Sequence, residues 1–415
     1  MLKVLPLAVR NLARYGRRTA LTAALIVIGV TAVLLFIAVT GSFKALMVGQ
    51  ITDSFLGSLQ IHRKGYVASI DTLPLNLNMP AQLTLQVEQA LRREPEIDAW
   101  SPRVKFAAMF SNFLETTSVR VNGVDPAREA ATEPLLPGRV RNGAREGPLL
   151  ERGQILVPTL IAAGLKVNAG DTVVLVATNR DGSVNGKTLE IRGTLESATG
   201  PGGRDSYIHI DDARELLRMQ APEVSEIAVR LRDLTQVDAV VGRLEAAFAG
   251  ITNSPGRPAL EVHGWQKLTP FANVANMIDL LTLFIKIVLL AIVLVSIMNV
   301  MIMAVYERVR EIGTIAAIGT PPRRILLLFL SEGLVLAVGA TLAGIVVSLA
   351  AVQALNLAGI TYAFGQQSDI RLAARLAASE VAVIAALVIA MGVLATLQPA
   401  WKASRMDPIQ ALRHV

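Results

Sequence analysis

The chain has 415 residues, of which 52% are hydrophobic, more than soluble globular proteins usually carry. It has no cysteine, and its four histidines lie too far apart for metal-ligand spacing, so we expect no disulfide and no metal site. The formal charge of +7 does not indicate nucleic-acid binding, because aromatic residues make up only 5% and the basic residues gather beside apolar runs. This pattern favours a membrane protein.

The first apolar run, residues 20–39, carries no charge and is long enough to cross a hydrocarbon core of about 30 Å. It follows a basic segment containing Lys3, Arg10, Arg14, Arg17 and Arg18. A cleaved signal peptide is the alternative, but the run exceeds a typical signal-peptide core and lacks a clear cleavage site. We therefore predict a membrane anchor.

Three more apolar runs follow late in the chain, at residues 287–305, 325–352 and 381–397. Glu332 is the only charged residue within these runs, and we expect it to snorkel to the cytoplasmic interface, with pairing to a basic group as the alternative. Ala340 and Gly344 have the small-x-x-x-small spacing that permits close helix contact.

The positive residues predict the sidedness of the four spans, because Lys and Arg mark cytoplasmic flanks. Basic residues precede the first span, lie between the second and third, and follow the fourth. Both termini are therefore predicted to be cytoplasmic, and residues 44–277 and 356–379 to lie outside.

The outer segment is predicted to begin and end with helices that extend beyond the bilayer as a stalk, with a local helical core as the alternative. The apolar positions that share a helical face are Phe43, Leu46, Met47 and Ile51, and then Phe271, Val274, Ile278, Leu281 and Ile285.

Between these helices the pattern is mixed and predicts a β-rich insert, about residues 117–225, on an α/β platform. The predicted helices are residues 82–92 and 211–219, the predicted strands are 119–124, 172–178 and 188–195, and the Gly- and Pro-rich breaks are 134–147, 199–203 and 254–258.

Residues 182–188, Gly-Ser-Val-Asn-Gly-Lys-Thr, look like a phosphate-binding loop but are one residue short and join two predicted strands. We interpret them as a hairpin loop. Since no nucleophile, metal or acid/base constellation can be assembled, we expect no enzyme activity and no cofactor in this chain.

The segment from Tyr306 to Gly319 is the most informative part of the sequence. Glu307 and Glu311 are spaced to share one helical face, and Ile312 lies on an apolar face. The spacing predicts a short amphipathic helix at the membrane surface, with a solvated loop that only follows the positive-inside rule as the alternative.

Glu307-Arg-x-Arg-Glu-Ile-Gly313, with Ala317 and Gly319 before a Pro/Arg-rich turn, resembles the motif after the second span of the FtsX/MacB-like permease family. This family includes the lipoprotein-releasing permeases LolC and LolE, whose architecture is most similar. Further segments that resemble the family are residues 10–14 and 17–19 before the first span, 121–126 and 165–173 in the outer domain, and 399–408 and 411–413 at the end.

The resemblance implies a type VII, or mechanotransmission, ABC permease: four transmembrane helices, one plus three, with a large α+β extracytoplasmic domain inserted between the first two. It implies that the motif is a coupling helix that docks into a separate ATPase dimer, which binds ATP and magnesium. The residues carried over to this role are Glu307, Arg308, Arg310, Glu311, Ile312, Gly313, Ala317 and Gly319.

The other implied partners are a second permease copy or paralogue, membrane lipids and a periplasmic carrier or adaptor, with no nucleic acid, in the bacterial inner membrane. The predicted segments are an N-terminal amphipathic helix (1–18), span one (19–43), the outer domain (44–277), span two with its stalk (278–305), the coupling turn (306–324), span three (325–355), an outer loop (356–379), span four (380–398) and a cytoplasmic tail (399–415).

The leading functional hypothesis is ATP-driven extraction of lipidated or amphiphilic cargo, similar to lipoprotein release. Its predicted cargo cleft is formed by Phe43, Leu46, Met47, Met277, Leu281 and Phe284.

The alternatives are a non-transporting regulator that activates an outer partner such as a cell-wall hydrolase, and a drug or peptide efflux permease. We expect a separate ATPase, because the sequence shows no ATPase motif. Loops 179–187 and 199–205 are candidates for carrier binding.

Overall fold

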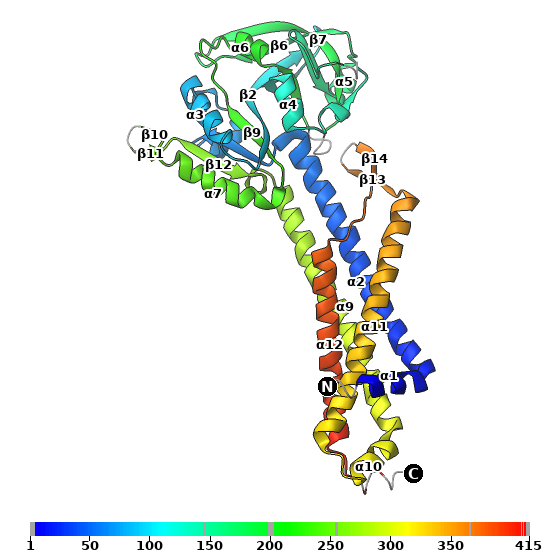
Figure 1. Ribbon diagram of the computed structural model, residues 1–415. Coiled ribbons are helices and arrows are strands. Elements are labelled where there is room, and N and C mark those ends of the chain that lie inside the picture. Colours follow the sequence, from blue (N-terminus) through cyan, green and yellow to red (C-terminus); the bar gives the residue numbers. More distant parts are fainter. Residues whose placement is uncertain are drawn as a thin grey trace. The chain divides into compact units, whose positions relative to one another are not determined.

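The computed structural model describes residues 5–143, 147–197, 203–253, 256–364, 367–407, 409 and 411 (Figure 1). Lys3, Arg413 and most of the predicted break at 199–203 lie outside the described residues. The chain divides into two compact units. We call Met1–Lys44, Asn276–Ile360 and Arg371–Val415 the helical unit, and Ala45–Ala275 with Thr361–Ile370 the inserted domain.

Four long apolar helices confirm the predicted order of one span followed by three. The helices that form the helical unit, in whole or in part, are α1 (Leu5–Arg14), α2 (Gly16–Ile51), α9 (Phe271–Glu307), α10 (Val309–Ala317), α11 (Pro322–Ala358) and α12 (Ala378–Ser404). With 36 residues in α2 and 37 in α9, each helix is about 55 Å long, well beyond a hydrocarbon core of about 30 Å. Both helices are therefore long enough to continue past the bilayer.

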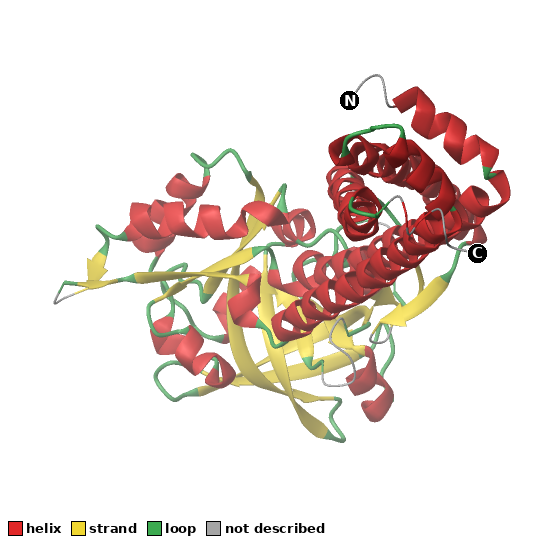
Figure 2. Ribbon diagram, turned by 90° about the horizontal axis from the view of Figure 1, so that it is seen from below, coloured by secondary structure: helices red, strands yellow, loops and turns green. Residues whose placement is uncertain are grey.

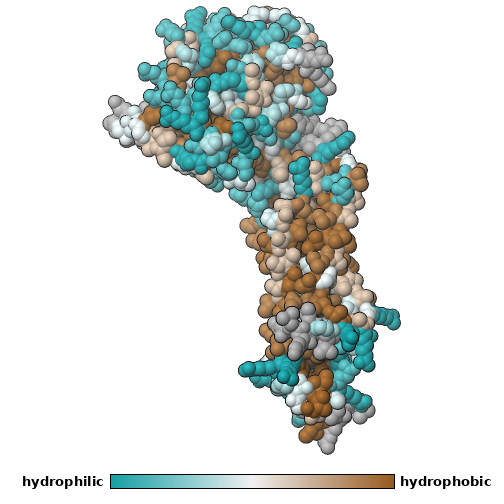
Figure 3. All heavy atoms as spheres, in the orientation of Figure 1, coloured by the Kyte–Doolittle hydropathy of each residue, from teal (hydrophilic) through white to brown (hydrophobic). Residues whose placement is uncertain are grey.

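Apolar side chains from all four long helices form one core in the helical unit, which includes Val30, Val293, Leu336 and Val388. Small residues allow close packing there. A Cβ atom added to Gly344 would lie 2.8 Å from the Cβ of Val30, so α11 contacts α2 at the predicted small-x-x-x-small site. On the face shown in Figure 3, apolar residues also predominate along the middle of the helices, as a lipid-facing surface requires.

The inserted domain is built on a ten-stranded sheet with the order β12-β1-β9-β2-β3-β8-β5-β7-β4, in which β6 pairs with β2 and β7. Most of its pairs are antiparallel, and β3 with β8 and β5 with β7 are parallel. Its strands are β1 (Leu59–Arg63), β2 (Ile97–Ser111), β3 (Thr116–Val124), β4 (Val140–Arg141), β5 (Gln154–Pro158), β6 (Thr172–Thr178), β7 (Val184–Leu195), β8 (Asp205–His209), β9 (Glu226–Leu231) and β12 (Leu260–Gly264).

Strand β2 joins the predicted insert to the predicted platform. Its first part pairs with β9, where Trp100 faces Val229, and its last part pairs with β6, where Phe110 faces Leu175. The insert and the platform therefore share one sheet. Two short hairpins lie outside it: β10 (Thr252–Asn253) with β11 (Arg257–Pro258), and β13 (Thr361–Phe364) with β14 (Gln367–Arg371).

Helices lie at the periphery of the strands in the inserted domain (Figure 2). The α-helices are α3 (Ala81–Leu91), α4 (Pro126–Thr132), α5 (Thr159–Leu165), α6 (Ile210–Leu216), α7 (Val237–Phe248) and α8 (Trp265–Leu268), and the shorter turns are η1 (Thr52–Leu56), η2 (Val67–Thr72), η3 (Leu75–Leu77), η4 (Pro137–Arg139) and η5 (Leu234–Gln236). Helix α6 packs closely on β3, because a Cβ atom on Gly123 would lie 2.4 Å from that of Ala213.

The local predictions in this domain are largely confirmed. The structure has helices α3 and α6 and strands β3, β6 and β7 where the patterns placed them, although β7 begins earlier, at Val184, and α6 ends at Leu216. The predicted hairpin is confirmed, but its loop is shorter and lies earlier than residues 182–188, because β7 already begins at Val184 and pairs with β6. Asn179 donates its N–H to the Ser183 carbonyl at 2.7 Å across this loop, and Gly182 has a φ of +83°.

Candidate functional site

The coupling motif lies on two helices that meet at Arg308. Helix α9 ends at Glu307 and α10 begins at Val309, while Arg308 has a φ of −107° and donates its N–H to the Val305 carbonyl, three residues back. The prediction that Glu307 and Glu311 share one continuous helical face is therefore wrong. The break coincides with burial of the Arg308 side chain.

The Arg308 guanidinium is buried against Glu332 of α11. Its Nη1 lies 3.0 Å from Oε1 and 3.1 Å from Oε2 of Glu332, and Asn11 of α1 donates to Oε1 at 2.6 Å. Glu332 is only 3% exposed. The expectation that Glu332 snorkels is therefore wrong, and the alternative of pairing is confirmed, because an unpaired buried carboxylate would be strongly unfavourable.

The same arginine also contacts the aromatic ring of Tyr15, whose centroid lies 4.2 Å from the guanidinium carbon. The Tyr15 hydroxyl donates to Glu311 Oε1 at 3.1 Å. We call Asn11, Tyr15, Arg308, Glu311 and Glu332 the Arg308 node. It ties α10 to the residues around α1 and to α11, all within the helical unit. The sequence could not reveal it, because Asn11 and Glu332 are separated by 321 positions.

The predicted coupling residues divide into a buried and an exposed group. Arg308, Ile312 and Gly313 are buried, and Ile312 belongs to the apolar core of the helical unit. The residues exposed to solvent are Glu307, Arg310, Glu311, Ala317 and Gly319. Gly319 has a φ of +88°, a left-handed conformation that glycine adopts readily after a helix end. The buried group thus anchors α10, and the exposed group presents a charged surface.

The predicted cleft residues also differ in exposure. In the helical unit, Phe43, Met277, Leu281 and Phe284 are all exposed. In the inserted domain, Leu46 is half-buried, and Met47 is only 3% exposed and so does not offer its side chain to a ligand in this structure. Lys44 and Asp279 form an ion pair at 2.5 Å between α2 and α9.

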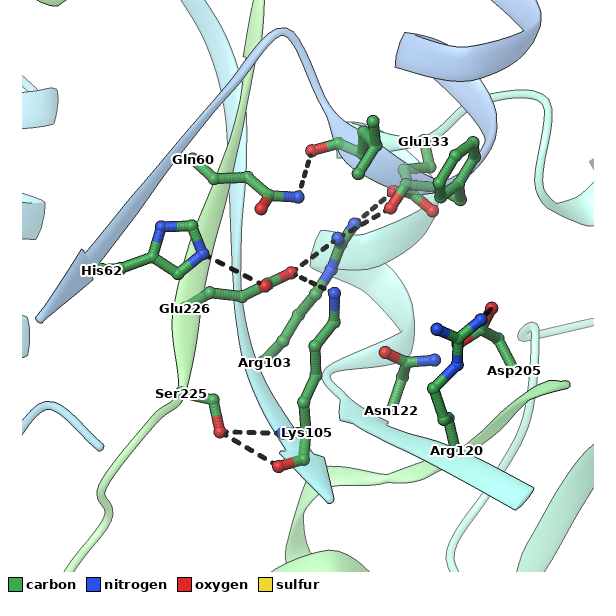
Figure 4. Close-up of polar contacts among 12 residues, drawn as sticks. Gln60, His62, Arg103, Lys105, Arg120, Asn122, Glu133, Asp205, Ser225 and Glu226 are labelled. Carbon is green, nitrogen blue, oxygen red and sulfur yellow. Dashed lines mark hydrogen bonds and ion pairs between the residues drawn. The ribbon is translucent and has the colours of Figure 1, made fainter. Parts of the chain in front are cut away.

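A second buried polar cluster, which the sequence patterns did not indicate, lies in the inserted domain (Figure 4). Arg103 of β2 is 1% exposed and forms ion pairs with three fully buried carboxylates, Glu129, Glu133 and Glu226. Burial, reinforced by Glu129 and opposed by Arg103, raises the pKa of Glu133 to about 8. The pKa of Glu226 is instead lowered: burial would raise it, but Lys105, His62 and Arg103 together outweigh that effect.

Within the described residues, no group of three His, Asp or Glu side chains is arranged to hold a metal ion. The expectation that this chain carries no metal or other cofactor stays a prediction.

The four spans, the domain inserted after the first, and the anchored helix α10 together define an ABC-type permease. Residues 19–247 match the MacB-like periplasmic core domain, and residues 283–408 match the FtsX-like permease C-terminal domain. The chain therefore belongs to the MacB/FtsX-like family of permeases, with the type VII architecture.

Three relatives illustrate the range of this family. The chain is 28% identical over 408 residues to the pyoverdine export ATP-binding/permease protein PvdT of Pseudomonas syringae pv. tomato, covering 95% of this chain and 57% of that protein. It is 31% identical over 201 residues to the macrolide export ATP-binding/permease protein MacB of Syntrophobacter fumaroxidans, covering 48% and 27%. It is 24% identical over 408 residues to the lipoprotein-releasing system transmembrane protein LolC of Neisseria meningitidis serogroup B, covering 94% and 92%. The chain thus spans little more than half of the first of these proteins.

Proposed function

We propose that this chain is the permease subunit of an ATP-driven transporter that extracts lipidated or amphiphilic cargo from the bacterial inner membrane by mechanotransmission. ATP and magnesium would bind to a separate ATPase dimer that docks on α10. Both termini would be cytoplasmic and the inserted domain periplasmic, as the distribution of basic residues predicts.

The observation that carries the proposal is the anchored coupling turn. The Arg308 node fixes the start of α10 to α1 and α11, while Glu307, Arg310 and Glu311 remain exposed. A force applied to that surface is therefore passed to the membrane helices directly. Helix α9 then continues without a break from Glu307 to Phe271, so that it can carry a displacement over about 55 Å.

The composition of the spans supports mechanical transmission over a solute channel. The four predicted apolar runs contain a single charged residue, Glu332. Its carboxylate forms an ion pair with Arg308 and accepts a hydrogen bond from Asn11. An aqueous pathway through a membrane protein needs polar or charged groups along it. These spans therefore suit a protein that moves rigid helices.

Helix α9 supports the proposal that a second permease and the cargo contact this chain there. In the apolar 18-residue stretch of α9, only 17% of the residues are buried, compared with 39% in the corresponding stretches of α2 and α11. Its exposed side chains include Met277, Leu281 and Phe284. An uncovered apolar helix face of this kind suits either a partner helix or an acyl chain in the membrane.

Lipoprotein-type cargo is favoured because the similarity to LolC runs over almost the full length of both chains. Efflux of a small molecule is the second candidate, because the similarity to the pyoverdine exporter also covers 95% of this chain. A regulator that activates a periplasmic partner is the third candidate, and it predicts ATP-dependent activation without bound cargo.

Copurification of the tagged chain with its bound proteins and lipids tests the proposal, combined with an ATPase assay. Glu311→Lys reverses an exposed charge in the coupling turn and should abolish the associated ATPase activity. Glu115→Lys makes the same change at an exposed position in the inserted domain and should leave it intact. An acylated protein in the eluate would support lipoprotein cargo, whereas a bound small molecule would support efflux. Absence of any associated ATPase would refute the permease proposal.

A further inference from the structure

The C-terminal end of α2 passes into the inserted domain through the π-helical turn η1. The last four carbonyl groups of a helix have no partner within the helix and need hydrogen bonds from elsewhere. The first carbonyl of η1, that of Thr52, accepts the N–H of Gly57 at 3.0 Å. The next four carbonyls, from Asp53 to Leu56, lie at the end of the turn, where partners within a helix run out.

Each of these four carbonyls accepts a hydrogen bond from a different donor in the inserted domain. The bonds run from Leu135 N to Asp53 O (3.0 Å), from Arg139 Nη1 to Ser54 O (2.7 Å), from Arg103 Nη1 to Phe55 O (2.9 Å), and from Gln60 Nε2 to Leu56 O (2.8 Å). Two of the donors are guanidinium groups, whose charge also favours the negative end of the helix dipole.

The two arginines are themselves held in place. Arg139 is 4% exposed and donates a further hydrogen bond from Nε to the Glu196 carbonyl at 2.8 Å. Arg103 forms ion pairs with Glu129, Glu133 and Glu226, and Figure 4 shows Glu133 and Glu226 on different sides of its guanidinium. The donors therefore come from several separate segments of the domain, and neither arginine can shift without breaking further buried polar contacts.

The strand after η1 adds a further connection. Ser58 donates its N–H to the Val229 carbonyl at 2.7 Å and accepts the Leu231 N–H on its Oγ at 3.0 Å, and β1 then pairs with β9 and β12. Gly57 has a φ of +74°, and a Cβ atom there would lie 2.9 Å from the Val229 carbonyl oxygen. The chain therefore leaves the helix directly into the sheet, with no flexible linker between them.

We propose that these four donors form a rigid joint, which makes the end of α2 and the inserted domain move as one body during the transport cycle. Arg103 and Arg139 are then positioning residues for transport. The inference rests on the proposed function, since it assigns the point where helix movement enters the domain. The contact pattern of the chain agrees, because Ala45 to Ile51 of α2 belong to the same compact unit as the domain.

The test removes two of the four donors and leaves Arg103 and its three carboxylate partners unchanged. Gln60→Met with Arg139→Met deletes the bonds to Leu56 and Ser54, whereas removal of Arg103 would leave three buried carboxylates without their guanidinium and could unfold the domain. Arg141→Met is the matched control, because Arg141 also lies beside Glu196 but pairs with its side chain at 3.0 Å, whereas Arg139 donates to the Glu196 carbonyl and to η1.

The readout is the distance between a label in each unit of the assembled complex, with and without ATP. Because the chain has no cysteine, labels can be placed at Leu114→Cys in the inserted domain and Ile318→Cys in the coupling turn, which are 90% and 78% exposed. Wild type and Arg141→Met should show a distance change with ATP. The double variant should retain ATP hydrolysis but lose that change.

A disulfide between Asp53→Cys and Leu135→Cys, formed before labelling, should restore the distance change in the double variant. The backbone N–O distance of 3.0 Å brings these two positions within the usual reach of a disulfide. The same variant without the cysteine at position 135 is the control. An unaltered distance change in the double variant, or its loss without rescue by the disulfide, would overturn the joint. Absence of any change in wild type would instead refute the proposed function.

Discussion

Replacement of Arg308 by methionine should destabilise the helical unit strongly. The arginine and Glu332 lie 3.0 Å apart and are both buried, and at an effective dielectric constant of about 20 two unit charges at that distance attract by about 5 kcal/mol. Removing one partner of a buried pair typically costs about 3–5 kcal/mol, because the other charge stays buried and unpaired. Asn11 would remain as a neutral hydrogen-bond donor to Glu332 and would recover only part of this loss.

Thermal unfolding of the purified chain in lipid-containing detergent measures this effect. The double variant Arg308→Met with Glu332→Met should unfold much closer to wild type than Arg308→Met alone, since it leaves no buried charge. Arg310→Met is the control, because Arg310 is an exposed arginine two positions along the chain from Arg308. If the double variant is as unstable as the sum of the two single variants, then Arg308 and Glu332 are not coupled and the reasoning is wrong.

Two further substitutions test the interiors of the two units. The pKa of Glu133 is raised from 4.5 to about 8, so between these pH values the folded chain keeps a proton that the unfolded chain releases. Through this group, the stability of the folded chain should therefore fall as the pH rises from about 4.5 to about 8. Glu133→Gln should reduce that slope in thermal unfolding measured against pH, and an unaltered slope would show that another group causes it. Gly344→Val should destabilise by about 1–3 kcal/mol, because the added Cβ would lie 2.8 Å from the Cβ of Val30. Equal stability of Gly344→Val and wild type would contradict the close contact between α2 and α11.

The membrane architecture could be predicted from sequence because its signals are local. A span must supply about 20 consecutive apolar residues, and hairpin strands such as β6 and β7 show their alternation and turn within a short window. The motif around Glu307 was also visible, because its residues are adjacent. What the local pattern missed there was the helix break at Arg308 and the buried partner of this arginine, Glu332, 24 positions away.

The remaining features depend on residues that are distant in sequence. Asn11 approaches Glu332 across 321 positions, and nothing near either residue indicates the other. Strand β2 also escaped prediction, because it contains Pro102 and several charged residues, including Arg103, which becomes favourable only when three carboxylates surround it. The donors that hold η1 likewise come from segments up to 85 positions away.

We propose that ATP hydrolysis by a partner at α10 releases lipidated cargo from this chain. The most direct measurement is the amount of acylated protein that leaves the purified complex in lipid vesicles when ATP is added, for wild type and for Glu311→Lys. We expect ATP-dependent release by wild type and none by the variant. Acylated protein that stays bound to an actively hydrolysing wild-type complex would contradict it.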